Sequence, residues 1–217
     1  MAAVVLEIWR AERMSADPFT IYPDGCRDVI WYALPGEAPR WRLTALDLTS
    51  RLLVGVTGAS MQGFRLRPGA MVSPDLLCGA LRQDTPEDAE AAIAALSVVP
   101  DNLAEVLAAC AALPAGGVEG LARRLGVSAR TVQRLVVDAT AQGPLYWLRL
   151  ARLRAALQSG QAGEPLAQAA AGAGFADQAH FSREARAFHG ESPARLLNNP
   201  RAMAAILAPG FGAVEPG

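Results

Sequence analysis

The sequence predicts an α+β protein in which a small β-rich front part is followed by a helical linker and an all-α back part. In residues 19–72, apolar and polar residues alternate in short segments separated by Gly and Pro, a pattern typical of strands and turns. From residue 118 onward, apolar residues recur at helical spacing almost throughout.

The sign of the net charge changes near the same boundary. Residues 1–115 carry 9 Arg and 14 acidic residues, a net charge of −5, and residues 116–217 carry 11 Arg and 7 acidic residues, a net charge of +4. We therefore expect two domains with different partners.

Composition excludes several classes of protein. Hydrophobic residues make up 52% of the 217 residues, which is enough to bury a core. No run of 18 apolar residues occurs, so we expect no membrane-spanning helix and no membrane partner. The N-terminal stretch MAAVVLEIW lacks basic residues and contains Glu7, so it is predicted to be a first strand rather than a signal peptide.

Cysteine and histidine are both scarce. The cysteines are odd in number and widely spaced: Cys26, Cys78 and Cys110. This argues against a secreted disulfide framework and favours a reduced, cytoplasmic location. The two histidines, His180 and His189, leave the first 179 residues without imidazole. We therefore expect no metal site and no cofactor.

The front part is predicted in two pieces. Residues 1–84 form the β-rich domain, in which FTIYPDGCRDVIWYAL turns at Pro-Asp-Gly, and a compact sheet or small barrel is expected. Residues 85–116 form the helical linker. Its first helix covers EDAEAAIAALSVV, and the residues suited to its N-cap, N1 and N3 positions are Thr85, Pro86 and Asp88. Asp101 is expected to cap a second helix, NLAEVLAACAAL, and Pro114-Ala-Gly-Gly117 marks the domain boundary.

The back part, residues 117–198, is predicted to contain five main helices. In chain order they cover VEGLARRL, ARTVQRLVVDAT, LYWLRLARLRAALQSG, PLAQAAAGAG and DQAHFSREARAFHG. Ser128 is the expected cap of the second helix, and Tyr146 and Trp147 are expected to pack the third helix against its neighbours. Gly190 and Ser192-Pro193 end the compact part, and residues 199–217 are assigned to a tail.

A helix–tight turn–helix pattern occurs twice in this basic half. A small Ala and a turn Gly recur 48 residues apart: Ala122 and Gly126, then Ala170 and Gly174. The small Ala lets two helices approach closely, and the Gly permits a sharp reversal between them. The helices that follow align 49 residues apart, so the second turn is expected to carry one extra residue.

The second helix of each copy carries a polar face. In the first copy this face contains Arg130, Gln133 and Arg134, and in the second it contains Gln178, Ser182 and Arg183. Arg and Gln offer bidentate hydrogen bonds that match guanine and adenine edges in the DNA major groove. The alternative for each residue is an ordinary solvated helix surface.

The segments GVSARTVQRLV, GPLYWLRLARLRAAL and GFADQAHFSREARAFHGESP resemble the DNA-binding domain of the AraC/XylS family of bacterial transcription regulators. The resemblance covers roughly residues 117–197 and implies two helix-turn-helix subdomains on a central helix. Each subdomain would place its recognition helix in the major groove of double-stranded DNA. The resemblance implies DNA contacts for Ser128, Arg130, Thr131, Gln133, Arg134, Gln178, His180, Ser182 and Arg183. The sequence departs from the family pattern where Val136 and Ala185 replace Phe and Leu196 replaces Tyr.

The segments YPDGCRDVIW, LVGVTG and GFRLRPGA resemble a small cupin-like domain found in front of some AraC-type regulators. The resemblance implies that residues 1–84 sense a small organic effector or form a homodimer. The candidate ligand-binding residues are Asp24, Cys26, Arg27, Asp28 and Trp31. The alternative is a turn whose carboxylates and Arg tie strand ends together. For Cys26, a redox-sensing thiolate beside Arg27 competes with a buried structural thiol.

The sequence thus predicts a sequence-specific DNA-binding transcription regulator. A ligand- or protein-binding adaptor that no longer reads DNA is the alternative. Catalysis is not expected, because no His lies in the same half as Cys26 to act as its base, and Arg27 favours ion pairing of Asp24 and Asp28 over a raised carboxyl pKa.

Overall fold

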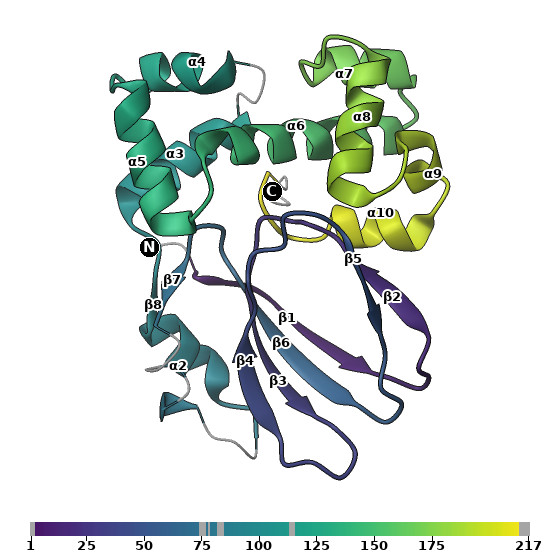
Figure 1. The fold of residues 1–217 in the computed structure, drawn as a ribbon. Helices are drawn as coiled ribbons and strands as arrows, with labels where there is room; N and C mark the ends of the chain where they lie inside the picture. Colours follow the sequence, from purple (N-terminus) through teal and green to yellow (C-terminus); the bar gives the residue numbers. More distant parts are fainter. Residues whose placement is uncertain (1–2, 74–76, 78, 82–84, 113–115, 213–217) are drawn as a thin grey trace.

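The computed structural model describes residues 3–73, 77, 79–81, 85–112 and 116–212. Strands and helix α2 make one layer, and helices α3 to α10 make a second layer packed on the ends of the strands (Figure 1). The predicted α+β class, with strands first and helices after, is confirmed.

An antiparallel sheet of four strands, in the order β1-β6-β3-β4, forms the centre of the front layer. The strands are β1 (Val5–Glu12), β6 (Ser60–Leu66), β3 (Asp28–Ala33) and β4 (Arg40–Leu43). Two further pairs stand apart: β2 (Pro18–Ile21) with β5 (Arg51–Val54), and β7 (Met71–Val72) with β8 (Ser97–Val98). In the described residues the strands thus form three separate sheets, and the cupin-like character of the domain stays a prediction.

The core of this layer is apolar and lies under α2 (Ala89–Ala95). Val29, Phe64 and Leu66 of the sheet are almost completely buried, as is Ile93 of the helix. Burying each such side chain stabilises the fold by about 1.5–3 kcal/mol. Because its buried side chains share this core, helix α2 belongs to the same layer as the sheet.

The predicted linker differs from the structure at three points. Helix α2 begins at Ala89 with Asp88 at the N-cap, rather than with Thr85 there, and the Asp88 side chain makes no capping hydrogen bond. It ends at Ala95, because the β-branched pair Val98-Val99 before Pro100 favours extended backbone. Residues 97–98 form β8 instead.

Helix α3 (Asp101–Ala112) packs with the later helices. It begins at Asp101 itself, so this residue lies in the first turn and not before it. Leu103, Leu107 and Cys110 are buried in the same core as the helices that follow. The packing boundary between the two layers therefore falls near residues 96–100. Of the predicted boundary Pro114–Gly117, residues 114 and 115 lie outside the described residues, as does Cys78.

Helix α6 (Pro144–Gln161) forms the axis of the helical layer. Its buried residues Trp147, Leu150 and Leu153 face helices packed on several sides. Helices α4 (Gly117–Arg124) and α5 (Ala129–Thr140) lie at one end, and α7 (Leu166–Gly172) and α8 (Gln178–His189) at the other (Figure 1). The predicted packing role of Trp147 is confirmed, because the indole is 1% exposed.

The chain end also differs from the predicted tail. Helix α9 (Pro193–Leu197) is followed by α10 (Pro200–Ile206), which contributes Met203 and Ile206 to the helical core. Beyond it, Phe211 packs edge-on against Trp147, with ring centroids 4.8 Å apart. Residues 200–211 are therefore part of the folded helical layer.

Candidate nucleic-acid interface

The first helix–turn–helix unit is built by α4 and α5. Ala122 is 3% exposed where the two helices approach, and Gly126 takes a φ of 66°, a conformation that favours glycine. The Ser128 side chain then accepts a hydrogen bond from the Thr131 backbone N–H at 3.0 Å. This satisfies an orphan donor at the start of α5, as predicted.

The second unit repeats the arrangement with α7 and α8. Ala170 is fully buried, Gly174 has a φ of 81°, and Asp177 caps α8 by accepting from the His180 N–H at 2.6 Å. Phe175, in the turn, is buried against Phe181, with ring centroids 5.2 Å apart. The two copies seen in the sequence are therefore two copies of one structure.

The predicted DNA contacts of the first unit all lie at the exposed start of α5. Every one of them is solvent-exposed: Ser128, Arg130, Thr131, Gln133 and Arg134. In the second unit Gln178 and Arg183 are exposed, while His180 and Ser182 are half-buried. The His180 ring meets Phe175 edge-on at 5.3 Å, so it is partly engaged in the turn.

Three arginines on these faces have no side-chain partner within the described residues. Within the described part of the chain, Arg130, Arg134 and Arg183 form no ion pair and no side-chain hydrogen bond. Arg149, by contrast, donates to both carboxylate oxygens of Glu184, at 2.6 and 3.0 Å. That pair fixes α8 on α6 and leaves the other guanidinium groups available for a ligand.

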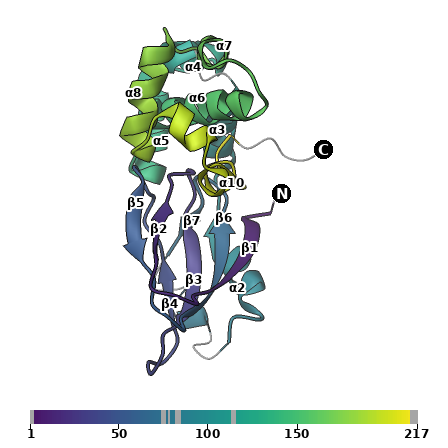
Figure 2. The ribbon, with the colours of Figure 1, turned by 90° about the vertical axis from the view of Figure 1, so that its right-hand side faces the viewer.

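Both recognition-helix candidates lie on the same side of α6. In the side view of Figure 2, α5 and α8 lie toward one side of the helical layer and α3 lies toward the other. Helix α6 has 18 residues, so at about 1.5 Å per residue it is roughly 27 Å long, and the two units lie at its opposite ends (Figure 1). This length is close to the roughly 34 Å between successive major-groove faces on one side of DNA.

The predicted ligand residues of the front layer are used within the fold. Asp24 and Asp28 form ion pairs with Arg65, at 3.3 and 3.5 Å, and not with Arg27. For Asp24 the expectation that ion pairing prevents a raised carboxyl pKa is wrong, because burial raises the pKa of this carboxyl more than Arg65 lowers it. Arg65 also pairs with Glu7 at 3.2 Å. The Arg27 guanidinium instead donates to the Ala70 carbonyl. The sequence reasoning missed Arg65, which lies 37 residues beyond its nearest acidic partner.

Cys26 does not have the environment of a reactive thiol. It is 5% exposed, and burial, followed by the negative charge of Asp24, raises its thiol pKa well above the ordinary value. The neighbouring Arg27 points to a carbonyl and contributes nothing to lowering that pKa. The geometry matches the structural thiol of the two alternatives. Trp31 is half-buried beside the β core.

The loop that carries these residues joins the two layers. The Asp24 carbonyl accepts from the Phe211 N–H at 2.8 Å. Gly25 has a φ of 78°, and a Cβ there would lie 2.5 Å from the Phe211 Cβ, so only glycine fits. The Tyr146 hydroxyl donates to the Asp47 carbonyl at 3.2 Å, and the Phe188 carbonyl accepts from the Ser50 N–H at 2.7 Å. The last contact reaches the C-terminal end of α8.

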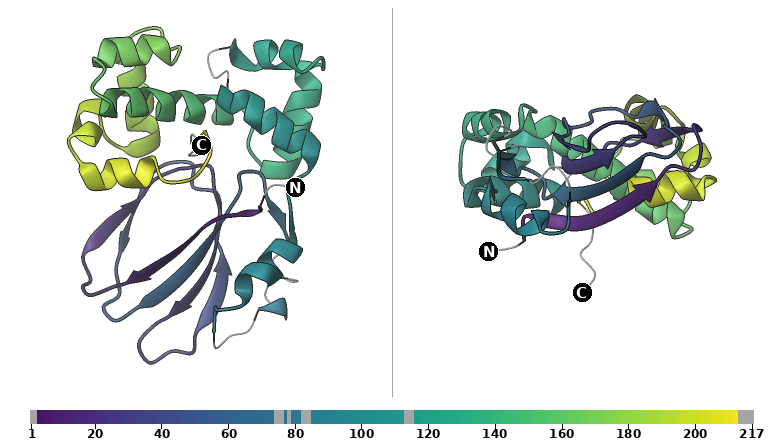
Figure 3. Two further views of the ribbon diagram at one scale, coloured as in Figure 1. Left: turned by 180° about the vertical axis from the view of Figure 1, so that it is seen from behind. Right: turned by 90° about the horizontal axis from the view of Figure 1, so that it is seen from below.

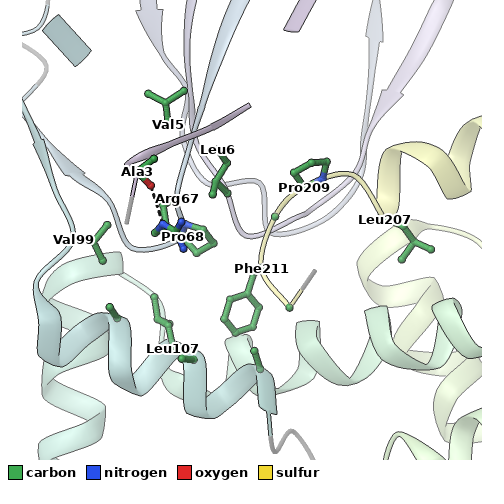
Figure 4. Close-up of a pocket in the computed structure, with 15 residues that line it drawn as sticks. Ala3, Val5, Leu6, Arg67, Pro68, Val99, Leu107, Leu207, Pro209 and Phe211 are labelled. Carbon is green, nitrogen blue, oxygen red and sulfur yellow. Dashed lines mark hydrogen bonds between the residues drawn. The ribbon is translucent and has the colours of Figure 1, made fainter. Parts of the chain in front are cut away.

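A cleft of about 630 Å³ lies between the layers near the N-terminus (Figure 4). Its walls are mainly apolar: Leu6 of β1, Leu107 of α3, and Leu207 and Phe211 near the chain end. Arg67 is at its edge, where its Nε donates to the Ala3 carbonyl at 3.0 Å. None of the predicted ligand residues lines it.

Two kinds of feature are absent from the described residues. No helix there is long and apolar enough to cross a bilayer. No group of three or more His, Cys, Asp or Glu side chains there is placed to hold a metal ion.

Comparison with known proteins supports the prediction made for the back half of the chain. Residues 121–199 match the family model of a helix-turn-helix domain. Neither the curated proteins nor the solved structures contain a match to the chain. The matched range spans α5 to α9, including both candidate recognition helices, and Leu121–Arg124 of α4. The chain therefore carries a helix-turn-helix domain over residues 121–199, and this domain supports DNA binding and transcription regulation.

Proposed function

We propose that this protein is a transcription regulator that reads double-stranded DNA with α5 and α8 together. One observation carries the proposal: two copies of a capped helix–turn–helix unit lie on one side of α6, and their Arg130, Arg134 and Arg183 side chains are exposed and have no ion-pair partner among the described residues. Guanidinium groups at such positions can bind guanine edges or phosphates. Catalysis is not part of the proposal.

The second unit is as well packed as the first. Phe175, Phe181 and Phe188 are all at most 5% exposed, and they fill the space around the small residues of α7. Val136 and Ala185, which stand where the family has Phe, are themselves fully buried. We therefore assign DNA readout to both units, and the adaptor that has lost DNA binding becomes an outcome of the test.

Fluorescence anisotropy on DNA from upstream of the gene, against a shuffled competitor, tests the proposal. The wild-type protein should prefer the upstream DNA, and Arg134→Ala and Arg183→Ala should each lose about 1–3 kcal/mol of that preference. Arg40→Ala is the matched control, because Arg40 is an exposed arginine on β4 that pairs with Glu37. It should bind as wild type does.

Salt separates DNA binding from the adaptor. Several phosphate contacts by arginine predict a steep, log-linear loss of affinity with added salt. If neither DNA is preferred at any salt concentration and both variants behave as wild type, the adaptor is the better account.

We infer further that the front layer modulates DNA binding, by sensing a small organic effector or by dimerisation. Support comes from the contacts between the layers, among them the Ser50–Phe188 hydrogen bond at the end of α8. A change in the β2–β5 region would thus act directly on a recognition helix.

A further inference from the structure

The chain that follows α10 passes between the two layers. Helix α10 ends at Ile206, and residues 207–212, here called the latch, form neither helix nor strand. Seen from behind in the left view of Figure 3, this yellow segment lies between α6 and the ends of the strands. Because backbone groups outside helices and sheets need other partners, the place of the latch depends on its contacts with the two layers.

Two contacts hold the latch on the helical layer. Arg154 of α6 is 2% exposed, and its guanidinium donates to the Ile206 carbonyl and, at 2.8 Å, to the Ala208 carbonyl. Phe211 is 3% exposed and packs edge-on against Trp147 of the same helix. Figure 4 shows its ring directed toward the helices. The latch is thus joined to α6 by a charge-assisted hydrogen bond and by an aromatic contact.

The front layer holds the same few residues from the other side. Arg65 of β6 donates to the Pro209 carbonyl at 3.2 Å, and the Asp24 carbonyl accepts from the Phe211 N–H at 2.8 Å. Gly25 leaves room for Phe211, because a Cβ on Gly25 would lie 2.5 Å from the Phe211 Cβ. Residues 208–211 therefore bond one layer and the other in turn.

Release of the latch with the layers still in contact would leave buried groups without partners. Arg154 would lose its Ala208 acceptor, and its Nε already lacks a hydrogen-bond partner among the described residues. Trp147, which is 1% exposed, would lose the Phe211 ring. A buried charge without partners is strongly destabilising, so these groups would need water. Water can reach them only where the layers part.

We propose that residues 207–212 fix the front layer on α6, and that release of this latch and separation of the two layers are one event. The other hydrogen bonds described between the layers, from Tyr146 to Asp47 and from Ser50 to Phe188, are single bonds between neutral groups. The latch, by contrast, receives hydrogen bonds from two guanidinium groups, one in each layer. It thereby sets the arrangement in which the front layer meets the helix-turn-helix units.

Two buried cysteines can report on the latch separately from unfolding. Cys26 lies at the junction, where the charges of Arg65 on β6 and Arg154 on α6 both act on its thiol. Cys110 lies on α3 in the core of the helical layer. Separation of the layers should expose Cys26 and leave Cys110 protected, whereas global unfolding exposes both.

Phe211→Ala removes the ring that packs on Trp147. Iodoacetamide labelling of the folded protein, followed by peptide mass spectrometry, should modify Cys26 at least about tenfold faster than in the wild type, relative to Cys110. Phe175→Ala is the matched control, because it removes an equally buried ring from the turn between α7 and α8, and it should leave this ratio unchanged. An unchanged ratio in Phe211→Ala would overturn the proposal.

Arg154→Met acts on the other side of the contact. It removes the hydrogen bonds to Ile206 and Ala208 but keeps a long apolar side chain in α6. The same preferential labelling of Cys26 is expected, so the proposal is tested even where Phe211→Ala does not fold. Equal acceleration at Cys26 and Cys110 in both variants would mean that the latch only stabilises the whole fold, and this would overturn the proposal.

Hydrogen exchange of the Ser50 amide distinguishes separation of the layers from local loosening. This N–H bonds the Phe188 carbonyl across the junction and belongs to a different contact from the latch. In Phe211→Ala it should exchange at least about tenfold faster than in the wild type, while amides within α6 keep their protection, as measured by NMR. An unchanged Ser50 rate beside a labelled Cys26 would show that the latch opens alone, which would contradict the single event.

Neither measurement involves DNA, so the latch and the proposed function can fail independently. If Cys26 and Ser50 respond as expected and the protein binds no DNA, the proposed function fails and the latch stands. If the protein reads DNA with both recognition helices and neither probe responds in the variants, the latch fails and the proposed function stands.

Discussion

Replacing His189 should change how the stability of the protein depends on pH. The pKa of this buried imidazole is lowered from 6.5 to about 3, by burial first and then by the charge of Arg154. A lowered folded-state pKa means that the unfolded chain binds the extra proton, so the stability that the neutral ring confers is complete above pH 6.5 and is lost as the pH falls toward 3. At 1.36 kcal/mol per pKa unit, this single group removes about 2 kcal/mol of stability between pH 7 and pH 5.

Urea denaturation of the wild-type protein and of His189→Phe at pH 7 and pH 5 measures this loss. The acids and arginines are common to both proteins, so the difference in the pH slope isolates the imidazole. The wild-type protein should lose about 2 kcal/mol more than the variant. Equal losses would mean that the folded protein accommodates a protonated ring, and the argument from burial would be refuted.

Three further predictions concern the fold. Arg65→Met leaves three carboxylates without their shared partner and should cost about 3–5 kcal/mol in urea denaturation, whereas Arg40→Met, at an exposed pair, should cost less than about 1 kcal/mol. Ser128→Ala should cost about 1 kcal/mol in the same assay, and Ser128→Gly only a few tenths. Iodoacetamide at pH 7.5 should leave Cys26 unmodified in the folded protein and modify it in urea, as measured by peptide mass spectrometry; fast labelling of the folded protein would restore the redox-sensing hypothesis.

The sequence predicts best where the signal is local. The capping Ser128, the turn glycines Gly126 and Gly174, and the buried stripes lie within a few residues of the helices they define, and the structure has them where they were expected. The polar face of α5 follows from the same helical spacing. The two helix–turn–helix units therefore needed no knowledge of distant contacts.

Interactions between distant segments were not predictable in this way. Arg65 meets Glu7, Asp24 and Asp28 because β6 pairs with both β1 and β3, and no spacing in the sequence encodes that order of strands. For the helix at the chain end, by contrast, the sequence does contain a local indication. Asn199 before Pro200 marks a helix start, and its side chain accepts from the Ala202 N–H at 3.1 Å.

The way the layers meet makes α8 the element through which the front layer would act. The Ser50 N–H bonds the Phe188 carbonyl, and His189 follows at once, facing Tyr22 from the front layer. Arg183 lies on the same helix, one residue before Glu184, through which the Arg149–Glu184 pair holds α8 on α6. Helix α5 also packs on α6, but its predicted DNA contacts lie at its start, beside the turn from α4. A displacement of this end of α8 by the front layer would alter the spacing and angle of the two recognition helices, and simultaneous binding of two major-groove faces depends on that spacing and angle.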